Sequence, residues 1–201
     1  MIMNLVITGV GGQGNVLASQ ILGLAAVRKG MKVTIGETFG LSQRGGPVMS
    51  HVRFHQQEYV GPVIPPNSAH IIMGLEPLET IRVLPELANE DTIVLVNERP
   101  IYPLNVIAGE VEYPDPMWIK EVIQENTRKC YWVNATKEAM ALGAAIFLNS
   151  IMLGALTSIE KFPLKSSDIL QIFEERFKGR QLDLNKKAFE VGIELIKRFK
   201  N

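Results

Sequence analysis

The chain is poor in cysteine, with Cys130 as the single one among 201 residues. One thiol cannot form a disulfide within the chain, and it cannot supply a four-cysteine zinc or iron–sulfur site. A basic excess is also missing, because 21 Lys and Arg residues balance 21 Asp and Glu residues. Without an overall positive charge, the chain lacks the electrostatic footprint of a nucleic-acid-binding protein. We therefore expect no metal site on this chain and no nucleic-acid partner.

Targeting and membrane signals are missing too. The first ten residues have no basic region and no small-residue cleavage site, so we expect no signal peptide and a cytoplasmic location. Residues 139–159 carry no charge and are long enough to span a bilayer. Asn149 and two glycines interrupt this segment, and no aromatic belt or basic cluster marks its ends. We expect a helix buried in a core or a subunit interface, and no membrane partner.

What is present fits one packed domain. Apolar residues make up 46% and charged residues 21%, and this length predicts a single domain over residues 1–201. Short apolar, β-branched runs predict strands at 4–10, 31–35, 48–54, 69–73, 92–96 and 130–134. Helical spacing predicts helices at 13–29, 76–87, 115–127, 167–179 and from 184 onward. This alternation indicates a Rossmann-like α/β fold, with a mostly parallel sheet flanked by helices and a helical C-terminal layer.

Local signals refine these elements. Asp115 is the expected N-cap of its helix, with Pro116 at the first helical position. Pro85 is expected to interrupt the 76–87 helix. The alternating polarity of the 48–54 strand predicts partial exposure. The last helix is expected to bury one apolar face, made of Leu184, Ala188, Val191, Leu195 and Phe199.

A glycine-rich turn joins the first strand to the first helix. Its sequence, Gly9-Val10-Gly11-Gly12-Gln13-Gly14, matches the G-x-G-x-x-G pattern in the strand–turn–helix context which that pattern requires. Glycines permit close approach of the backbone to an anion, and the helix N-terminus adds free N–H groups and a positive dipole end. We expect this loop to bind an anion or a nucleotide-like ligand. The alternative is that the glycines serve only the packing of the helix on the sheet.

Glu37 lies at the end of the second predicted strand, where a nicotinamide-dependent dehydrogenase holds the ribose of its cofactor. An independent NAD(P)-binding oxidoreductase is therefore one interpretation. A non-catalytic nucleotide-binding or assembly protein with the same fold is another. The dehydrogenase interpretation has a defect, because its second strand should lead into a second helix. Here residues 37–47 are polar and glycine-rich, and another strand follows.

A second polar loop precedes that strand, with the sequence Ser42-Gln43-Arg44-Gly45-Gly46. Arg44 can bind a phosphate or a carboxylate through two hydrogen bonds, and Ser42 and Gln43 can add orienting bonds. The alternative is a solvated turn with an exposed arginine.

Other polar side chains point to no further chemistry. His51, His55 and His70 are too scattered for a metal site, so we expect them to be structural or exposed. Ser42 lacks the G-x-S-x-G elbow of a hydrolase nucleophile. Cys130, in a predicted buried strand, is expected to be a small core residue. Asn149 could donate a hydrogen bond across an interface or be a satisfied core amide.

The two loops together, followed by the strand sequence VMSHVRF, resemble one family closely. The chain is similar to the gamma-type subunit or domain of the 2-oxoacid:ferredoxin oxidoreductases, and within them to the small subunit of the indolepyruvate-type enzymes. Residues 149–156, 162–163 and 188–192 extend the resemblance over most of the chain.

The resemblance implies a subunit of an enzyme that oxidatively decarboxylates a 2-oxoacid with coenzyme A (CoA), giving an acyl-CoA, carbon dioxide and reduced ferredoxin. The family uses thiamine diphosphate with Mg²⁺ and [4Fe–4S] clusters. The single cysteine cannot ligate a cluster, and no G-D-G…N-N thiamine pattern is present. These cofactors are therefore expected on a large partner subunit, and this chain is expected to be inactive alone.

The resemblance also assigns the two loops to the CoA or substrate site at the subunit interface. The residues concerned are Gly9, Gly11, Gly12, Gln13 and Gly14 in the first loop and Ser42, Gln43, Arg44, Gly45 and Gly46 in the second. No catalytic residue is assigned. The oligomeric state stays open, with a homodimer of the isolated chain among the possibilities.

Overall fold

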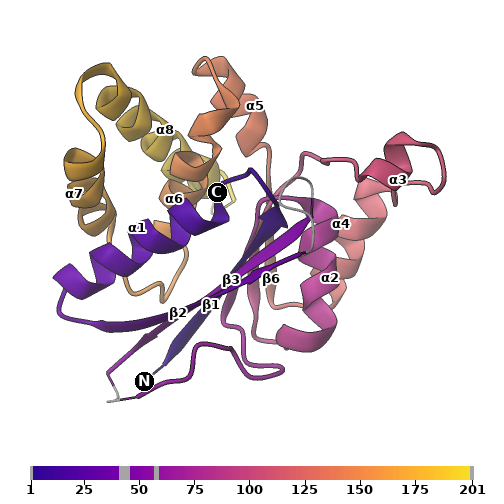
Figure 1. Cartoon of the computed structure of the whole chain (residues 1–201), viewed down its shortest axis with the longest axis horizontal. Helices are drawn as coiled ribbons and strands as arrows, with labels where there is room; N and C mark the ends of the chain where they lie inside the picture. The colour runs from indigo at the N-terminus through magenta and orange to yellow at the C-terminus, as the bar shows by residue number, and fades with distance from the viewer. Residues whose placement is uncertain (1, 41–45, 57–58, 200–201) are drawn as a thin grey trace.

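The computed structural model describes residues 2–40, 46–56 and 59–199 (Figure 1). The strands are β1 (Met3–Val10), β2 (Lys32–Phe39), β3 (Pro47–His55), β4 (Ile71–Gly74), β5 (Ile93–Asn97) and β6 (Lys129–Val133). The helices are α1 (Asn15–Arg28), α2 (Pro77–Leu87), α3 (Leu104–Ile107), α4 (Pro116–Glu125), α5 (Ala135–Ala141), the 3-10 helix η1 (Ala145–Phe147), α6 (Leu148–Thr157), α7 (Ser166–Arg176) and α8 (Gly179–Lys197). The predicted α/β class is confirmed.

The strands form one sheet in the order β2-β3-β1-β4-β5-β6. β1, β4, β5 and β6 are mutually parallel, and Ile7 of β1 pairs with Met73 of β4. β3 is antiparallel to both of its neighbours, so that Ile7 also lies opposite Ser50. The short connection between β2 and β3 explains this direction, because a parallel crossover needs a dozen residues or more. The sheet is mostly parallel, as predicted, with β3 as the exception.

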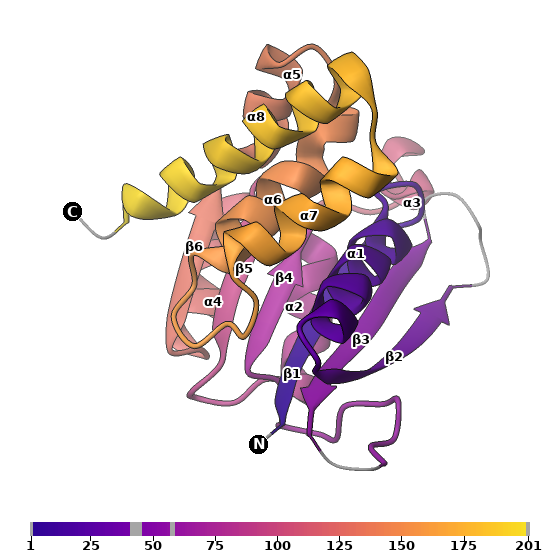
Figure 2. The same cartoon turned by 90° about the vertical axis from the view of Figure 1, so that its left-hand side faces the viewer.

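Helices cover both faces of the sheet, each over its own apolar core (Figure 2). On one face α1 packs with α5 to α8, which form the predicted helical C-terminal layer. On the other face α2 and α4 pack over Val6, Ile72 and Val94. Every residue of β1 is buried, which agrees with its uninterrupted apolar sequence.

The uncharged stretch is not the single helix predicted from its composition. It is divided into α5, η1 and α6, and the chain turns at Gly143, whose φ is +112°. α6 is the buried part, since Leu148 to Leu156 are all buried. Within the described residues, no helix combines the length and the apolar character needed to cross a membrane.

Glycines let α6 approach α8 closely. A Cβ atom at Gly154 of α6 would overlap the backbone of Phe189, and one at Gly192 of α8 would overlap the carbonyl of Ile151. This contact sets the rotation of α8, which buries Asn185, Ala188, Phe189, Gly192, Leu195 and Ile196. The face predicted from the sequence was therefore partly wrong, since Leu184 and Val191 are half-buried and Phe199 is exposed.

Two further expectations need correction. α2 runs without a break through Pro85, because this proline lies in the last turn, where its missing N–H removes a single helical bond. β3 is more buried than predicted, with Ser50 to His55 all shielded, because it lies between β1 and β2 rather than at an edge. Asp115 is the N-cap of α4, as predicted, and its carboxylate accepts the Met117 N–H at 2.8 Å.

Candidate functional site

The glycine loop lies where the chain changes from one face of the sheet to the other. β1 ends at Val10, and α1 begins after Gly14, whose φ of +86° favours glycine. α1 leaves onto one face, whereas α2, which follows the adjacent strand β4, covers the other. The carboxyl ends of β1 and β4 therefore form the switch point at which open α/β sheets bind their ligands.

The side chain of Gln13 locks this loop. Its Oε1 accepts the N–H of Val10 at 2.8 Å, and its Nε2 donates to the carbonyl of Leu75, after β4, also at 2.8 Å. A Cβ at Gly9 would lie 2.5 Å from this Oε1 and 3.0 Å from the Cβ of Leu75. The glutamine thus occupies the backbone N–H of Val10, which is then not free to bind a ligand.

Two asparagines hold the loop from outside. Asn149 of α6 donates its amide to the carbonyl of Gln13 at 2.7 Å, within the chain rather than across an interface. Asn15 donates to the carbonyls of Ile7 and Val48 at 3.3 Å and 3.1 Å, which ties the start of α1 to β1 and β3. In the described part of the chain, the Oδ1 atoms of both asparagines are buried without a hydrogen-bond donor.

The second polar loop reaches this site at its last residue. The N–H of Gly11 donates to the carbonyl of Gly46 at 2.8 Å, which brings the two predicted loops together. Ser42, Gln43, Arg44 and Gly45 lie outside the described residues.

The glycine loop forms one wall of a cleft of about 890 Å³. The described residues that line it are Val10, Gly11, Gly12, Gln13, Gly14, Leu17, Arg99, Ile101, Thr136, Met140, Ala145, Ile146, Leu148 and Asn149. Among the described residues, the lining is mainly apolar and includes no carboxylate, and Arg99 is the one charged side chain. Sequence reasoning singled out neither Arg99 nor Thr136, although both follow the carboxyl ends of predicted buried strands.

A polar bridge fixes the wall opposite the loop. Asn97, at the end of β5, donates to the carbonyl of Leu75 at 3.1 Å and to the hydroxyl of Thr136 at 3.0 Å. The N–H of Thr136 donates back to the Oδ1 of Asn97 at 3.1 Å. Because Gln13 also donates to Leu75, one carbonyl joins the glycine loop to the β5 side of the cleft.

Glu37 does not face the glycine loop. Its two carboxylate oxygens accept the hydroxyls of Ser19, at 2.7 Å, and of Ser50, at 2.6 Å. β3 separates Glu37's strand from β1, so this acid is not placed for a ribose at the loop. The geometry gives no support to the NAD(P) interpretation.

The histidines have structural partners. His51 accepts the Ile64 N–H on its Nδ1 at 3.3 Å, and His70 accepts the Asn4 N–H at 3.1 Å. Burial lowers the pKa of both imidazoles. The Nε2 of His55 lies 3.0 Å from the hydroxyl of Thr34. Within the described ranges, no group of three or more His, Cys, Asp or Glu side chains could hold a metal ion.

Cys130 is not an activated nucleophile. Burial raises the pKa of its thiol to about 12, against a small opposing effect of Lys120. The thiol is therefore protonated at neutral pH, and the side chain packs against the core beneath α2 and α4.

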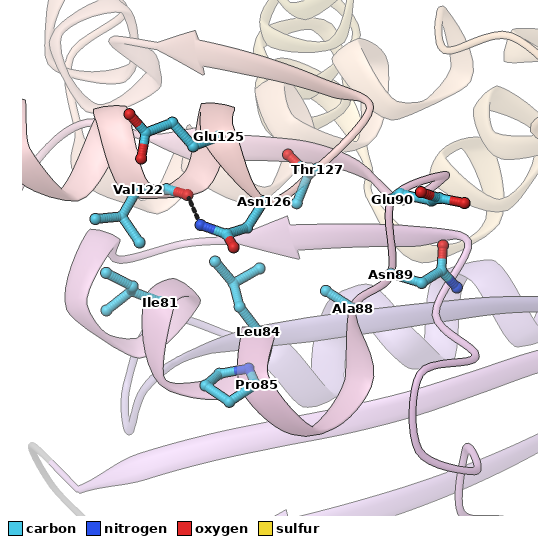
Figure 3. Close-up of a pocket in the computed structure, with 10 residues that line it drawn as sticks. All are labelled: Ile81, Leu84, Pro85, Ala88, Asn89, Glu90, Val122, Glu125, Asn126 and Thr127. Carbon is cyan, nitrogen blue, oxygen red and sulfur yellow. Dashed lines mark hydrogen bonds between the residues drawn. The ribbon is translucent and has the colours of Figure 1, made fainter.

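A second hollow, of about 590 Å³, lies between α2 and α4 (Figure 3). Ile81, Leu84 and Val122 line it, and Asn126 donates to the carbonyl of Val122 at 2.8 Å. It opens beside the ends of both helices, near the amino ends of β5 and β6. The negative ends of the helix dipoles and the acids Glu90 and Glu125 surround it, and none of its described lining residues is basic. It does not suit an anionic ligand.

Comparison with known proteins identifies the family. Residues 4–195 match the family model of pyruvate ferredoxin/flavodoxin oxidoreductase. The chain is 37% identical to the indolepyruvate oxidoreductase subunit IorB of Pyrococcus horikoshii, over 98% of each chain. It is also 37% identical to that of Thermococcus kodakarensis, over 96% of each chain. The chain belongs to the pyruvate ferredoxin/flavodoxin oxidoreductase family. Within it, the chain is a small subunit of a 2-oxoacid:ferredoxin oxidoreductase, as the resemblance implied.

Solved structures support the fold. The pyruvate oxidoreductase subunit PORC of Thermotoga maritima superposes with a TM-score of 0.72 at 22% identity, over 96% of each chain. A 2-oxoglutarate:ferredoxin oxidoreductase from Magnetococcus marinus, with 2-oxoglutarate, CoA and succinyl-CoA bound, superposes with a TM-score of 0.76 at 19% identity. The match covers 98% of this chain but 31% of that one, so this fold recurs there as one part of a longer polypeptide.

Proposed function

We propose that this chain completes the CoA and substrate site of an indolepyruvate-type oxidoreductase at the interface with a large subunit. That subunit would carry thiamine diphosphate, Mg²⁺ and the [4Fe–4S] clusters, because this chain has one cysteine, and its thiol is protonated and half-buried. The complex would work in the cytoplasm, convert the 2-oxoacid and CoA to an acyl-CoA and carbon dioxide, and pass the electrons to ferredoxin.

The observation that carries this proposal is the apolar rim of the cleft. Ile101, Met140 and Ile146 line the cleft, and they are 38%, 58% and 72% exposed. Nearby in the chain, the short helix α3 presents Leu104 and Ile107 to solvent and buries no residue. Apolar side chains gathered around a binding cleft favour burial by another polypeptide.

This rim is built on a fixed backbone. Buried Glu76, the N-cap of α2, accepts the N–H of Ile101 at 3.3 Å and the hydroxyl of Tyr113 at 2.5 Å on one carboxylate oxygen. Burial, together with the hydrogen bond to Glu76, raises the pKa of Tyr113, so the phenol remains a donor. The segment between β5 and α4 is thus held near both of its ends by hydrogen bonds to Glu76, at the start of α2. A rigid surface is what a stable subunit contact uses.

The interior of the cleft suits the anions of this reaction. Free N–H groups at the start of α1 and the guanidinium of Arg99 can bind the phosphates of CoA or the carboxylate of a 2-oxoacid. The apolar walls can hold an extended uncharged arm or an aromatic ring.

Co-expression with a large subunit of an indolepyruvate-type oxidoreductase tests the proposal. We expect the two chains to co-elute on size exclusion and the complex to oxidise indolepyruvate faster than pyruvate or 2-oxoglutarate. Ile146→Asp should release the partner, since it places a charge on the rim. Val27→Asp is the matched control, because Val27 is 60% exposed on α1 outside the cleft.

The isolated chain is run on the same column to test whether it forms a homodimer. Failure of the wild-type chains to associate contradicts the interface. If the Ile146→Asp variant still associates with the large subunit, the interface must lie elsewhere on the molecule.

A further inference from the structure

The strand β2 forms one border of the sheet, next to α1, and within the described residues no strand pairs with its outer side (Figure 2). The N–H of Gly40 donates to the carbonyl of Pro47 at 2.8 Å, which makes these two residues a hydrogen-bonded pair at the end of the β2–β3 ladder. Hydrogen-bonded pairs alternate with non-bonded pairs along an antiparallel ladder, so the even-numbered residues of β2 bond to β3. The odd-numbered residues direct their N–H and C=O groups outward: Val33, Ile35, Glu37 and Phe39.

The outer side of β2 is suited to pairing with another strand. Edge strands commonly avoid pairing through a proline, a bulge, a short length or lysine side chains. β2 has eight residues in unbroken register with β3, contains no proline, and has its one lysine, Lys32, at its first position. Its outward N–H and C=O groups therefore offer a regular ladder to a second strand.

Apolar side chains flank this border on the face that α1 covers. α1 packs against β2 at Gly23, where a Cβ atom would lie 2.9 Å from the Cδ1 of Ile35. Val27 is one turn further along the same side of α1, and it is more than half exposed. Phe39 lies on the same face of β2 as Ile35, because alternate residues of a strand share a face, and it is also more than half exposed. Both side chains are in place to contact a polypeptide bound along β2.

The opposite face of β2 carries another exposed apolar side chain, on a fixed loop. The carbonyl oxygen of Pro62 lies against β2, 2.9 Å from the Cβ position of Gly36. Buried Arg53 holds this loop, because its Nη1 donates to the carbonyls of Gly61 at 2.7 Å and Val63 at 3.0 Å. The side chain of Val63 is exposed. The border of β2 therefore has apolar groups on both faces of the sheet.

The charged groups beside this border have partners within the chain. Arg28 and Lys29, at the end of α1, form ion pairs with Glu175 and Asp168 of α7. The carboxylate of Glu37 accepts two serine hydroxyls. Two copies of the border can therefore meet with little repulsion between like charges, which favours a second copy over a strongly charged partner.

We infer that a second copy of this chain binds along β2 in antiparallel orientation and extends the sheet across a two-fold axis. An axis perpendicular to the sheet keeps each face on its own side, so that each flank of the border meets its own copy. Val27 then lies near the second copy's α1, and Val63 lies near the second copy's loop. The inference does not depend on the proposed function, because it uses this chain alone.

One register of this pairing uses all four outward residues of β2. It places Gly36 on the two-fold axis. Val33 then lies opposite the second copy's Phe39, and Ile35 lies opposite the second copy's Glu37, with two backbone hydrogen bonds at each pair. Phe39 and Val33 point to the face of α1, so this register covers the exposed phenyl ring of one copy with the other copy.

Sedimentation equilibrium of the isolated full chain over a series of concentrations tests the inference. We expect the wild type to form a dimer, and Phe39→Asp to raise the dimer Kd about 100-fold or more, because it places a carboxylate in an apolar contact. Val27→Asp is a second variant on the same border. Leu104→Asp is the matched control, since Leu104 is exposed on α3, which follows β5. Circular dichroism and the unfolding temperature check that each variant is folded.

Amide hydrogen exchange measured by NMR gives a readout specific to the register. In the dimer, the N–H groups of Val33, Ile35 and Glu37 should exchange slowly, and in Phe39→Asp they should exchange rapidly. The N–H groups of Thr34 and Gly36, which bond to β3, should stay protected in both proteins.

A chain that is monomeric at every concentration overturns the inference, and so does a dimer that survives both Phe39→Asp and Val27→Asp. Loss of the dimer in Leu104→Asp alone would place self-association near the rim of the cleft, against the inference. Both border variants should still co-elute with the large subunit. Release of that subunit by both would assign the border of β2 to the large subunit instead of a second copy.

Discussion

The side-chain amide of Asn149 and the main-chain carbonyl of Gln13 are joined by a 2.7 Å hydrogen bond across 136 positions of sequence. This bond ties the buried helix α6 to the glycine loop. The loop is also held by the side-chain hydrogen bonds of Gln13 and by the hydrogen bond from the Gly11 N–H to the carbonyl of Gly46. The loop is thus preorganised from three directions before any ligand arrives. Preorganisation reduces the entropy lost on binding, and it links the packing of the C-terminal helices to the site.

Asn149→Ala should weaken CoA binding as well as stability. The change removes the donor to Gln13, which we expect to cost about 1–3 kcal/mol of unfolding free energy and to raise KM for CoA. Urea denaturation of the isolated chain and kinetics of the complex measure the two effects. Ser150→Ala is the control, because Ser150 donates to Asn185 of α8 at 2.5 Å and does not line the cleft. A loss of stability alone, equal for the two variants, would show that Asn149 does not position the loop.

Gly14→Ala should be poorly tolerated, because the position has a φ of +86° and a Cβ there would overlap the amide nitrogen of Asn149. We expect a loss of about 2–3 kcal/mol in unfolding free energy. Gly12→Ala is the comparison, since Gly12 has a φ of +102° but open space around its Cβ position. The double variant Gly14→Ala/Asn149→Ala should recover the part that is due to the collision. Equal losses for the two glycines would leave backbone strain as the entire cause.

Gly154→Ala should separate α6 from α8. Since the added Cβ meets the backbone of Phe189, the helices must shift, at a cost of about 3 kcal/mol or more. Thermal and urea unfolding of the isolated chain measure it. Gly61→Ala serves as the control, because no atom lies within 4 Å of its Cβ position. A stability change below about 1 kcal/mol for Gly154→Ala would contradict the close approach.

Acid should destabilise the chain through His51, which is 3% exposed and accepts the Ile64 N–H. Burial lowers its pKa from the ordinary value of 6.5; Arg53 lowers it further, while Glu86 and Glu37 act in the opposite direction. Between the lowered pKa and 6.5, the unfolded chain binds more protons than the folded chain does. The contribution of His51 to the free energy of unfolding should therefore be constant above about pH 6.5. It should decrease as the pH falls from 6.5 toward the lowered pKa of His51.

Urea titrations at a series of pH values compare the wild type with His51→Gln. The variant should be less stable at neutral pH, because it alters a buried partner, but its stability should fall less steeply on acidification. Parallel curves for the two proteins would assign the acid sensitivity to other groups.

Local sequence signals predicted the strands and most helix bounds well. The buried parallel strands are short runs of β-branched residues, and Asp115-Pro116 marks the start of α4 through its own hydrogen bond. The glycine loop could also be predicted from the sequence, because its conformation depends on residues that are neighbours in the chain.

Features that depend on distant partners could not be predicted. The antiparallel insertion of β3, the rotation of α8 about Gly192 and the clamp from Asn149 each join segments far apart in the chain. Arg99 could not be singled out from the sequence, because no feature of the neighbouring residues distinguishes it from any other arginine that follows a strand. Its importance comes from the fold, which places the end of β5 and the start of α1 around one cleft.

The most direct test of the account measures viologen-dye reduction with indolepyruvate and CoA by this chain alone, by the large subunit alone and by the two combined. We predict no sustained turnover by this chain, even with added thiamine diphosphate, and CoA-dependent turnover by the combination. The large subunit alone should lack CoA-dependent turnover, because this chain supplies the cleft. Sustained turnover by this chain alone, or undiminished CoA-dependent turnover by the large subunit alone, would contradict the account.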